Sequence, residues 1–520
     1  MALGATKAMA DSRTNSLGLT AGQQIDDLDG IWMYPQDAAR FGNVADFRMA
    51  SLGSSDNWFG VIHKDWDDIG YLGIYTNRPF NQSFGWNEGP SANQNGILDG
   101  WNTWDQALSP FYSAYDGTRA GDPYGHVDAH YDHNNLHIQI PAPFNNIRVQ
   151  DPENKLDLFW AKDFTDATFG VHFNYAAQDG NNGGPNNGVG YGSTNGVFSP
   201  AATAGTGTNI SQTGNMYSGV LGLDLGLGLK NVGVIDSLDL AAGYSLGMVD
   251  YKEVNNRENP AQNGTNTWYN NAIKDDNISE IRANVLAKLK VNDTTTSRIF
   301  ANAKLGSLGL KQTFLTDTNN DGNNTDAGET TNLKNSYSDT NINLGFACDH
   351  NVADGKAHVI ASVSAIYDGR AWKQSGADNL AGSATADQLF TGSGSLQNED
   401  WWVVPVNVAV EAPLFPWLKA RIGASHNLFQ QITTKVVQKT NINAGGTAFQ
   451  DTTTASQSMD WPNGVNMTMG VGATFENFSL DMEMNEQQFE NYLTTFQPGA
   501  GIFYAGVTDM FWSADVRYAF

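Results

Sequence analysis

The last ten residues of the chain alternate between two kinds of side chain. Every second position from Trp512 to Phe520 is apolar, and the positions between them include Ser513, Asp515 and Arg517. A period of two is that of a β-strand with one apolar and one polar face. The stretch therefore predicts a terminal strand whose apolar face meets either a protein core or lipid.

The same alternation recurs along most of the chain. In residues 219–229, five leucines alternate with glycine and aspartate. From residue 156 onward the segments with this pattern are 156–163, 167–176, 219–229, 238–248, 281–289, 298–310, 339–349, 357–367, 402–412, 417–428, 464–475, 478–485 and 508–520. Residues 47–53, 57–63 and 69–76 are further candidates. Bacterial barrels have an even strand number, so the pattern favours fourteen strands, and sixteen require all three N-terminal candidates.

The connections between these segments alternate in length. The short ones are 230–237, 291–297, 350–356, 413–416 and 476–477. The long ones, rich in Asn, Asp, Gly, Thr and Ser, are 177–216, 249–277, 311–338, 368–401, 429–463 and 486–507. A closed antiparallel transmembrane β-barrel has short turns on the periplasmic side and long loops outside. The rhythm therefore predicts an all-β barrel of this kind, whose last strand ends in the periplasm.

Composition narrows the class of partner. The 520-residue chain has a formal charge of −26 and a pI of about 4.5, which argues against a nucleic-acid partner. Charged residues make up only 16%, and the single cysteine, Cys348, excludes an intrachain disulfide framework. No run of 18 apolar residues predicts a transmembrane helix.

The terminal strand resembles the assembly signature of bacterial outer-membrane β-barrel proteins, such as porins. The positions that carry the resemblance include Trp512, Tyr518 and Phe520. It implies a cell outer membrane location in a Gram-negative bacterium, contact with outer-membrane lipid and lipopolysaccharide, and recognition of the last strand by the barrel-assembly machinery. The alternative is the edge strand of a soluble β-domain.

Three regions are expected along the chain. Residues 1–10, which contain Ala8-Met9-Ala10, are interpreted as the remnant of a signal peptide. Residues 11–45 form a periplasmic lead-in or plug, and residues 46–520 form the barrel. Within the second region, residues 18–45 resemble the hatch of the long-chain fatty acid transporter family, with Tyr34-Pro35-Gln36 where that family carries Asn-Pro-Ala. No ligand-contacting residue is transferred from this resemblance.

The face opposite the apolar one carries charges of both signs. The predicted lumen-lining residues are Asp224, Asp239, Arg282, Lys288, Lys304, Glu411, Lys419, Arg421, Asp481, Glu483, Asp515 and Arg517. Such a lumen is either wet or filled by a segment with matched hydrogen bonds. The first hypothesis is a channel or diffusion transporter for small solutes. The alternatives are fatty-acid-transporter-like uptake of hydrophobic molecules and a structural or adhesive surface protein anchored by its barrel.

The face assignment also predicts how substitutions behave. Arginine in place of Leu225, on the lipid face, is expected to be costly. Arginine in place of Asp224, one residue away on the inner face, is expected to be tolerated better. No G-x-S-x-G or H-E-x-x-H motif is present, so the chain is not expected to be an enzyme.

Two polar stretches are candidates for metal ions. His126, Asp128, His130 and Asp132 would share one face of a strand, where imidazole and carboxylate can hold a transition metal. Solvated residues of a loop or lumen are the favoured interpretation. In residues 317–329, Asp317, Asn319 and Asp321 fit the first half of a calcium-binding loop, but Gly328 stands at position twelve. An acidic external loop is favoured there, and no other cofactor is expected.

Overall fold

The computed structural model describes residues 12–49, 58–65, 69–77, 154–183, 210–259, 264–316, 330–352, 357–375, 395–441, 449–460, 465–484 and 511–520. Three short helical elements come first: α1 (Ser12–Leu17), η1 (Leu28–Trp32) and η2 (Pro35–Ala39). The strands are β1 (Val44–Met49), β2 (Trp58–Asp65), β3 (Gly70–Thr76), β4 (Asn154–Asp163), β5 (Ala167–Gly183), β6 (Ile210–Val232), β7 (Ile235–Asn259), β8 (Gly264–Asn292), β9 (Thr295–Thr316), β10 (Thr330–Val352), β11 (Ala357–Ser375), β12 (Ser395–Phe415), β13 (Leu418–Asn441), β14 (Phe449–Asp460), β15 (Asn466–Phe475), β16 (Phe478–Met484) and β17 (Phe511–Ala519).

The strands form one closed antiparallel sheet. Each strand pairs with its neighbour in sequence, except that β15 pairs with β13 instead of β14, and β17 pairs with β1, which closes the ring of strands. Residues 418–425 of β13 pair with β15, and residues 430–441 pair with β14, so β14 and β15 share one position in the wall. The seventeen strands thus occupy sixteen positions, and the predicted closed barrel is confirmed. Closure joins the first strand to the last, so the backbone groups of β1 and β17 are paired with each other, as a bilayer requires.

The strand number is the larger of the two considered. The three N-terminal candidates correspond to β1, β2 and β3, and all three lie in the wall between β17 and β4. Only the first part of the candidate 47–53 is described. These strands have six to eight residues, close to the length of an ordinary soluble strand, so their pattern alone did not place them in the wall.

The outer surface of the barrel is apolar. Leu221, Leu223, Leu225 and Leu227 of β6 are exposed, while Asp224 between them is buried on the inner side. At the short-turn end, the rings of Phe415, Trp417 and Phe475 stack on one another, forming part of an aromatic girdle. Among the described residues, no helix is long and apolar enough to cross a membrane.

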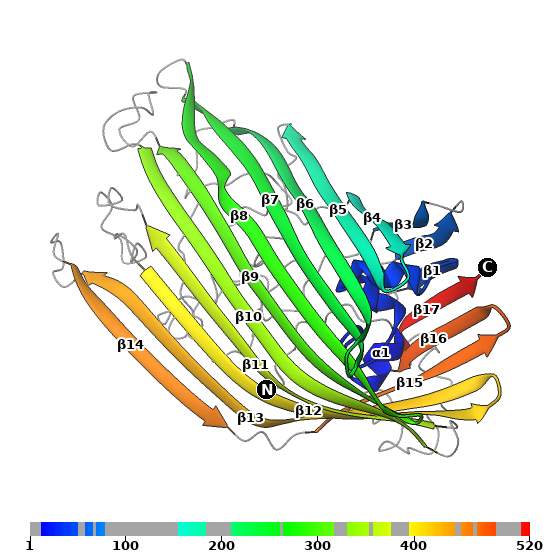
Figure 1. The fold of residues 1–520 in the computed structure, drawn as a ribbon. Coiled ribbons are helices and arrows are strands. Elements are labelled where there is room, and N and C mark those ends of the chain that lie inside the picture. Colours follow the sequence, from blue (N-terminus) through cyan, green and yellow to red (C-terminus); the bar gives the residue numbers. More distant parts are fainter. Residues whose placement is uncertain are drawn as a thin grey trace, which may run out of the picture.

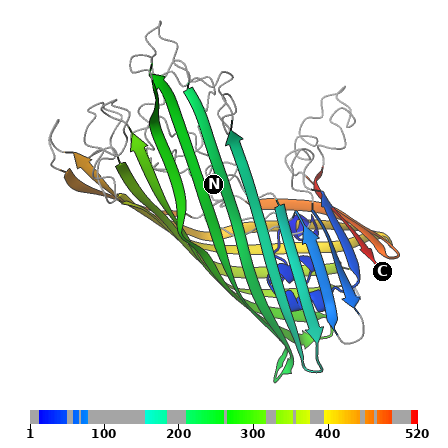
Figure 2. The same ribbon diagram turned by 90° about the horizontal axis from the view of Figure 1, so that it is seen from above.

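The strands from β6 to β13 are much longer than a bilayer requires. They contain 19 to 29 residues, whereas about 9–11 tilted residues suffice. The prediction of a long connection at 249–277 was therefore wrong, because β7 continues to Asn259 and β8 begins at Gly264. A strand beyond the bilayer meets water on both faces, so the alternation that reveals strands is lost there. Figure 1 and Figure 2 show this tall wall opposite the shorter β1–β3 and β15–β17.

Candidate functional site

The N-terminal segment, defined here as residues 12–43, lies inside the barrel. In Figures 1 and 2 it is the blue chain enclosed by the wall near the C-terminus. The C-terminus marks the short-turn end, because Phe520 donates its backbone N–H to Asn43 and Ala519 does so to Asn477 in the turn between β15 and β16. The segment therefore lies in the lumen at the short-turn end.

Local sequence explains why the segment is compact without long helices. Asp27 caps η1, with its carboxylate accepting a 2.6 Å hydrogen bond from the Leu28 N–H. Pro35 begins η2, where its missing N–H costs nothing. Gly18 and Gly22 adopt φ values of 62° and 71°, which reverse the chain after α1. Each element is therefore a single turn that needs the wall for stability.

Inward-facing glycines make room for the segment. A Cβ on Gly423 of β13 would lie 2.1 Å from the carbonyl oxygen of Leu17, and one on Gly170 of β5 would lie 2.1 Å from the backbone nitrogen of Gln36. Any larger residue would push the segment off the wall. Glycine in a strand marks the close approach of another backbone, so these two glycines form seats for α1 and η2.

The second half of the segment, residues 28–43, is held mainly by apolar contacts. Leu28, Ile31, Ala38 and Ala39 form one core with residues of β2, β3 and β4. The ring of Trp32 meets those of Trp58, Tyr75, Phe159 and His172 at centroid distances of 4.9 to 6.2 Å. This half is also continuous with β1, which begins at Val44, so it is anchored in two ways.

The first half, residues 12–27, is held mainly by ion pairs and hydrogen bonds. Arg13 contacts Glu411 at 3.1 Å, and Asp27 contacts Arg517 at 3.2 Å. Further direct bonds to the wall join Ser12 to Asp515 and Ser513, Asn15 to Glu483, Gln23 to Asn343 and Gln24 to Ser362. Its one apolar cluster joins Leu17, Leu19 and Ile25 to only two wall residues, Ile360 and Ala409.

Asp26 is the most highly connected carboxylate of this half. Arg298 donates two parallel hydrogen bonds to it, at 3.0 and 2.9 Å, and the Lys288 ammonium lies 2.9 Å away. Arg40 lies 3.5 Å away on the other side. Burial opposes ionisation of Asp26, but the attraction of Arg298, Lys288 and Arg40 is greater, so the pKa of Asp26 is lowered well below its ordinary value.

All the predicted lumen-lining residues stand at the alternate strand positions whose side chains face into the barrel. Most of them form ion pairs or hydrogen bonds. Those that contact the N-terminal segment directly are Asp239, Lys288, Glu411, Glu483, Asp515 and Arg517. The others pair within the wall: Asp224 with Arg282, Lys304 with Asp339, Arg421 with Glu411 and Asp481, and Lys419 with Glu411. The inner face at this level is therefore a packed ion-pair network.

Sequence reasoning missed several members of this network. Arg298 and Arg48 of the wall, and Arg13, Asp26 and Asp27 of the segment, were not singled out. The alternation of its strand places Arg298 on the inner face, so the sequence could have identified it. The segment residues have no periodicity that points to partners some 270 or more positions away.

His172 of β5 forms a second buried cluster. Its Nδ1 lies 2.9 Å from Asp224 and its Nε2 lies 2.8 Å from Asp157, while its ring stacks on Phe159. The ring bridges two carboxylates from neighbouring strands, so His172 links β4, β5 and β6.

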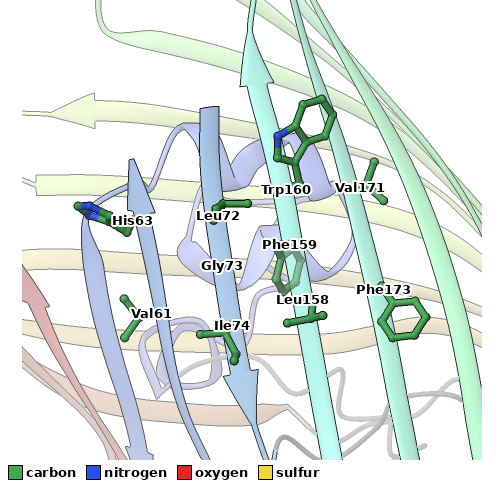
Figure 3. A pocket seen from close by; sticks show the side chains of 10 residues that line it. All are labelled: Val61, His63, Leu72, Gly73, Ile74, Leu158, Phe159, Trp160, Val171 and Phe173. Atoms are coloured by element: carbon green, nitrogen blue, oxygen red, sulfur yellow. The ribbon is translucent and has the colours of Figure 1, made fainter. Parts of the chain in front are cut away.

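A concavity of about 550 Å³ lies on the outer face of β2–β5. Figure 3 shows the side chains that line it. Two cross-strand rows of four side chains form it: His63, Leu72, Trp160 and Val171 in one, and Val61, Ile74, Leu158 and Phe173 in the other. Because these side chains point away from the lumen, the concavity faces lipid and is no solute site.

The remaining predicted sites are only partly described. The four candidate ligands at 126–132 and the three in 317–329 lie outside the described residues. Within the described part of the chain, no group of three His, Cys, Asp or Glu side chains could hold a metal ion. Tyr518 and Phe520 are exposed, with ring centroids 6.5 Å apart, and the side chain of Trp512 is not described.

Comparison with known proteins gives only distant likenesses. No family model matches the chain, and no curated protein matches its sequence. The ferric yersiniabactin uptake receptor FyuA from Yersinia pestis is 9% identical with a TM-score of 0.28, the match covering 92% of this chain and 78% of that one. The FrpB iron transporter (F5-1 variant) from Neisseria meningitidis is 8% identical with a TM-score of 0.24, covering 94% and 84%.

The class of the protein follows from its own geometry. A closed antiparallel sheet of sixteen positions with an apolar outer belt, an aromatic girdle and a polar interior is the architecture of bacterial outer-membrane barrels. The chain is an outer-membrane β-barrel protein whose lumen holds its own N-terminal segment.

Proposed function

We propose that the protein is a gated channel or transporter for small polar solutes, in which the N-terminal segment acts as a plug. The observation that carries the proposal is the uneven attachment of this segment to the wall. Residues 28–43 are fixed by apolar packing and by the chain itself. Residues 12–27 are attached mainly by polar bonds, whose loss on withdrawal would be offset by hydration of the groups that water then reaches.

The gating step would be the withdrawal of residues 12–27 from their glycine seat, with residues 28–43 remaining in place. The vacated space would be bounded by β9–β13 and β15–β17, whose inner faces carry charges of both signs. Solutes would pass along these side chains, and pore width and wall charge would set selectivity.

A disulfide lock tests this proposal. The hydroxyl oxygens of Ser12 and Ser513 are 2.7 Å apart, so cysteines at both positions can be joined after Cys348 is replaced by serine. In planar bilayers, we expect the oxidised Ser12→Cys/Ser513→Cys protein to show no openings, and the same protein to conduct after reduction. Equal conductance in both states would show that solutes do not need residues 12–27 to move.

A substitution that displaces α1 from the wall is expected to give the opposite result. In Gly423→Val, the new side chain would occupy the position of the Leu17 carbonyl, so α1 is displaced and we expect openings to become several-fold more frequent. Ala424→Val, one residue along β13 with its side chain on the other face, is the matched control and should behave as the wild type. A complete lack of conductance in every variant would favour the structural-anchor function.

We further propose that the last strand carries the assembly signal. Phe520 is half exposed, and its ring stacks on those of His63 and Tyr518, so Phe520→Asp should cost about 1–2 kcal/mol of unfolding free energy at most. In cells we expect the amount of assembled barrel to fall several-fold, measured as the heat-modifiable band on a gel. Normal assembly in cells would contradict a role in recognition.

A further inference from the structure

We propose that Lys288 and Arg298 form a binding site for a small organic carboxylate, which Asp26 occupies as a tethered mimic until such a solute displaces it. The inference names the solute class of the proposed function and rests on it for the transport step. The binding site itself stands on the contacts of these three side chains.

The two cations are arranged as a carboxylate site. Arg298 presents two donors in parallel to the two oxygens of Asp26, at 3.0 and 2.9 Å, and Lys288 adds a third contact at 2.9 Å. A guanidinium fork and a carboxylate match each other in shape and charge. The two residues lie on adjacent strands, β8 and β9, directly opposite each other in register, so the wall fixes their spacing.

The cations belong to the rigid wall, whereas the carboxylate belongs to the removable half of the segment. The side chains of Arg298 and Lys288 are only 3% and 6% exposed, while that of Asp26 is 35% exposed. Solvent therefore reaches the carboxylate and not the cations beneath it. A solute carboxylate can enter only by taking the place of Asp26.

Displacement of Asp26 would leave a basic surface. Among the described residues Arg298 has its only ion pair with Asp26, and its Nε atom is buried without a hydrogen-bond partner. Lys288 keeps Asp239 at the longer distance of 3.5 Å. The carboxylates that Arg13 would release behave differently, because Glu411 keeps both Arg421 and Lys419. The net effect is a site that attracts anions.

Competition with a tethered group has a measurable consequence. The chain tethers Asp26 beside the cations, so Asp26 competes with any free carboxylate. A free carboxylate binds only in the fraction of molecules in which Asp26 has moved away. Removing the Asp26 charge should strengthen the binding of a solute, whereas removal of a binding residue ordinarily weakens it. This reversed sign distinguishes mimicry from a purely structural ion pair.

The test is a calorimetric titration of succinate into the detergent-solubilised full chain at constant ionic strength. We expect Asp26→Asn to bind succinate at least about tenfold more tightly than the wild type. Adding Lys288→Gln to Asp26→Asn should abolish the gain. Asp163→Asn, which removes a carboxylate opposite Lys230 at the edge of the barrel, is the matched control and should leave succinate affinity unchanged.

Further arms keep the inference falsifiable. Should Asp26→Asn fail to fold, succinate during refolding should restore its heat-modifiable band, and neutral succinamide should not. Equal binding of chloride and succinate would overturn the specificity for carboxylates. Equal succinate affinity in Asp26→Asn and wild type, or no rescue, would overturn the site. Because binding is measured without conduction, a protein that binds succinate but never conducts would refute the proposed function and leave this site intact.

Discussion

Replacing Arg421 by methionine is expected to lower the free energy of unfolding by about 3–5 kcal/mol. The Arg421 guanidinium is 4% exposed and lies 2.7 Å from Glu411 and 2.6 Å from Asp481. Without it, Glu411 keeps Arg13 and Lys419, whereas Asp481 keeps only the Arg517 guanidinium at 4.0 Å among the described residues. The cost therefore comes mainly from a buried carboxylate that is left without a close cation. Urea titration of the protein in lipid vesicles, followed by tryptophan fluorescence, measures the change.

Lys419 supplies the matched control, since it contacts the same Glu411 at 3.2 Å but is 46% exposed. Lys419→Met should cost less than about 1 kcal/mol, because water replaces the ammonium there. If the two substitutions cost the same, burial does not govern the strength of these pairs, and the inner face is wetter than the packed network implies.

Leu225→Arg is expected to cost about 2–4 kcal/mol in the same assay. Leu225 is exposed on β6 and is the middle one of the five alternate leucines in residues 221–229, so its side chain meets hydrocarbon. Val234 in the turn between β6 and β7 is 90% exposed, and Val234→Arg should cost no more than about 1 kcal/mol, since it lies at the membrane interface. A smaller cost for Leu225→Arg than for Val234→Arg would place the bilayer elsewhere on the barrel.

The contacts of Asp224 argue against the expectation that arginine is tolerated better there than at Leu225. Its carboxylate lies 2.9 Å from His172 and 2.8 Å from Arg282, and it is buried. Arginine would bring a second guanidinium into this cluster and remove the carboxylate that joins His172 to Arg282. The face was assigned correctly from the alternation, but an inward position beside the N-terminal segment is a packed position and not a wet one.

Alternation and the lengths of the connections in the sequence were enough to predict the closed barrel, the inward and outward faces, and the short-turn end at which the last strand finishes. These features follow from local rules, because a strand in a bilayer must be apolar on one side at every second residue. The inward glycines were visible as well. Gly222, Gly226 and Gly228 alternate with the leucines of β6, although what they make room for was not visible. Gly222 leaves space for the Asn174 side chain, and Gly226 leaves space for that of Gln36.

Only the tertiary structure decided the strand number, the height of the wall and the partners of the charged residues. Short strands such as β1 carry too few residues for a pattern, and strands above the bilayer lose their alternation because water bathes both faces. The ion pairs join the first half of the segment, residues 12–27, to strands hundreds of residues away, as Arg13 is joined to Glu411. No local rule encodes such a pair, since the closure of the barrel around the segment is what brings the two charges together.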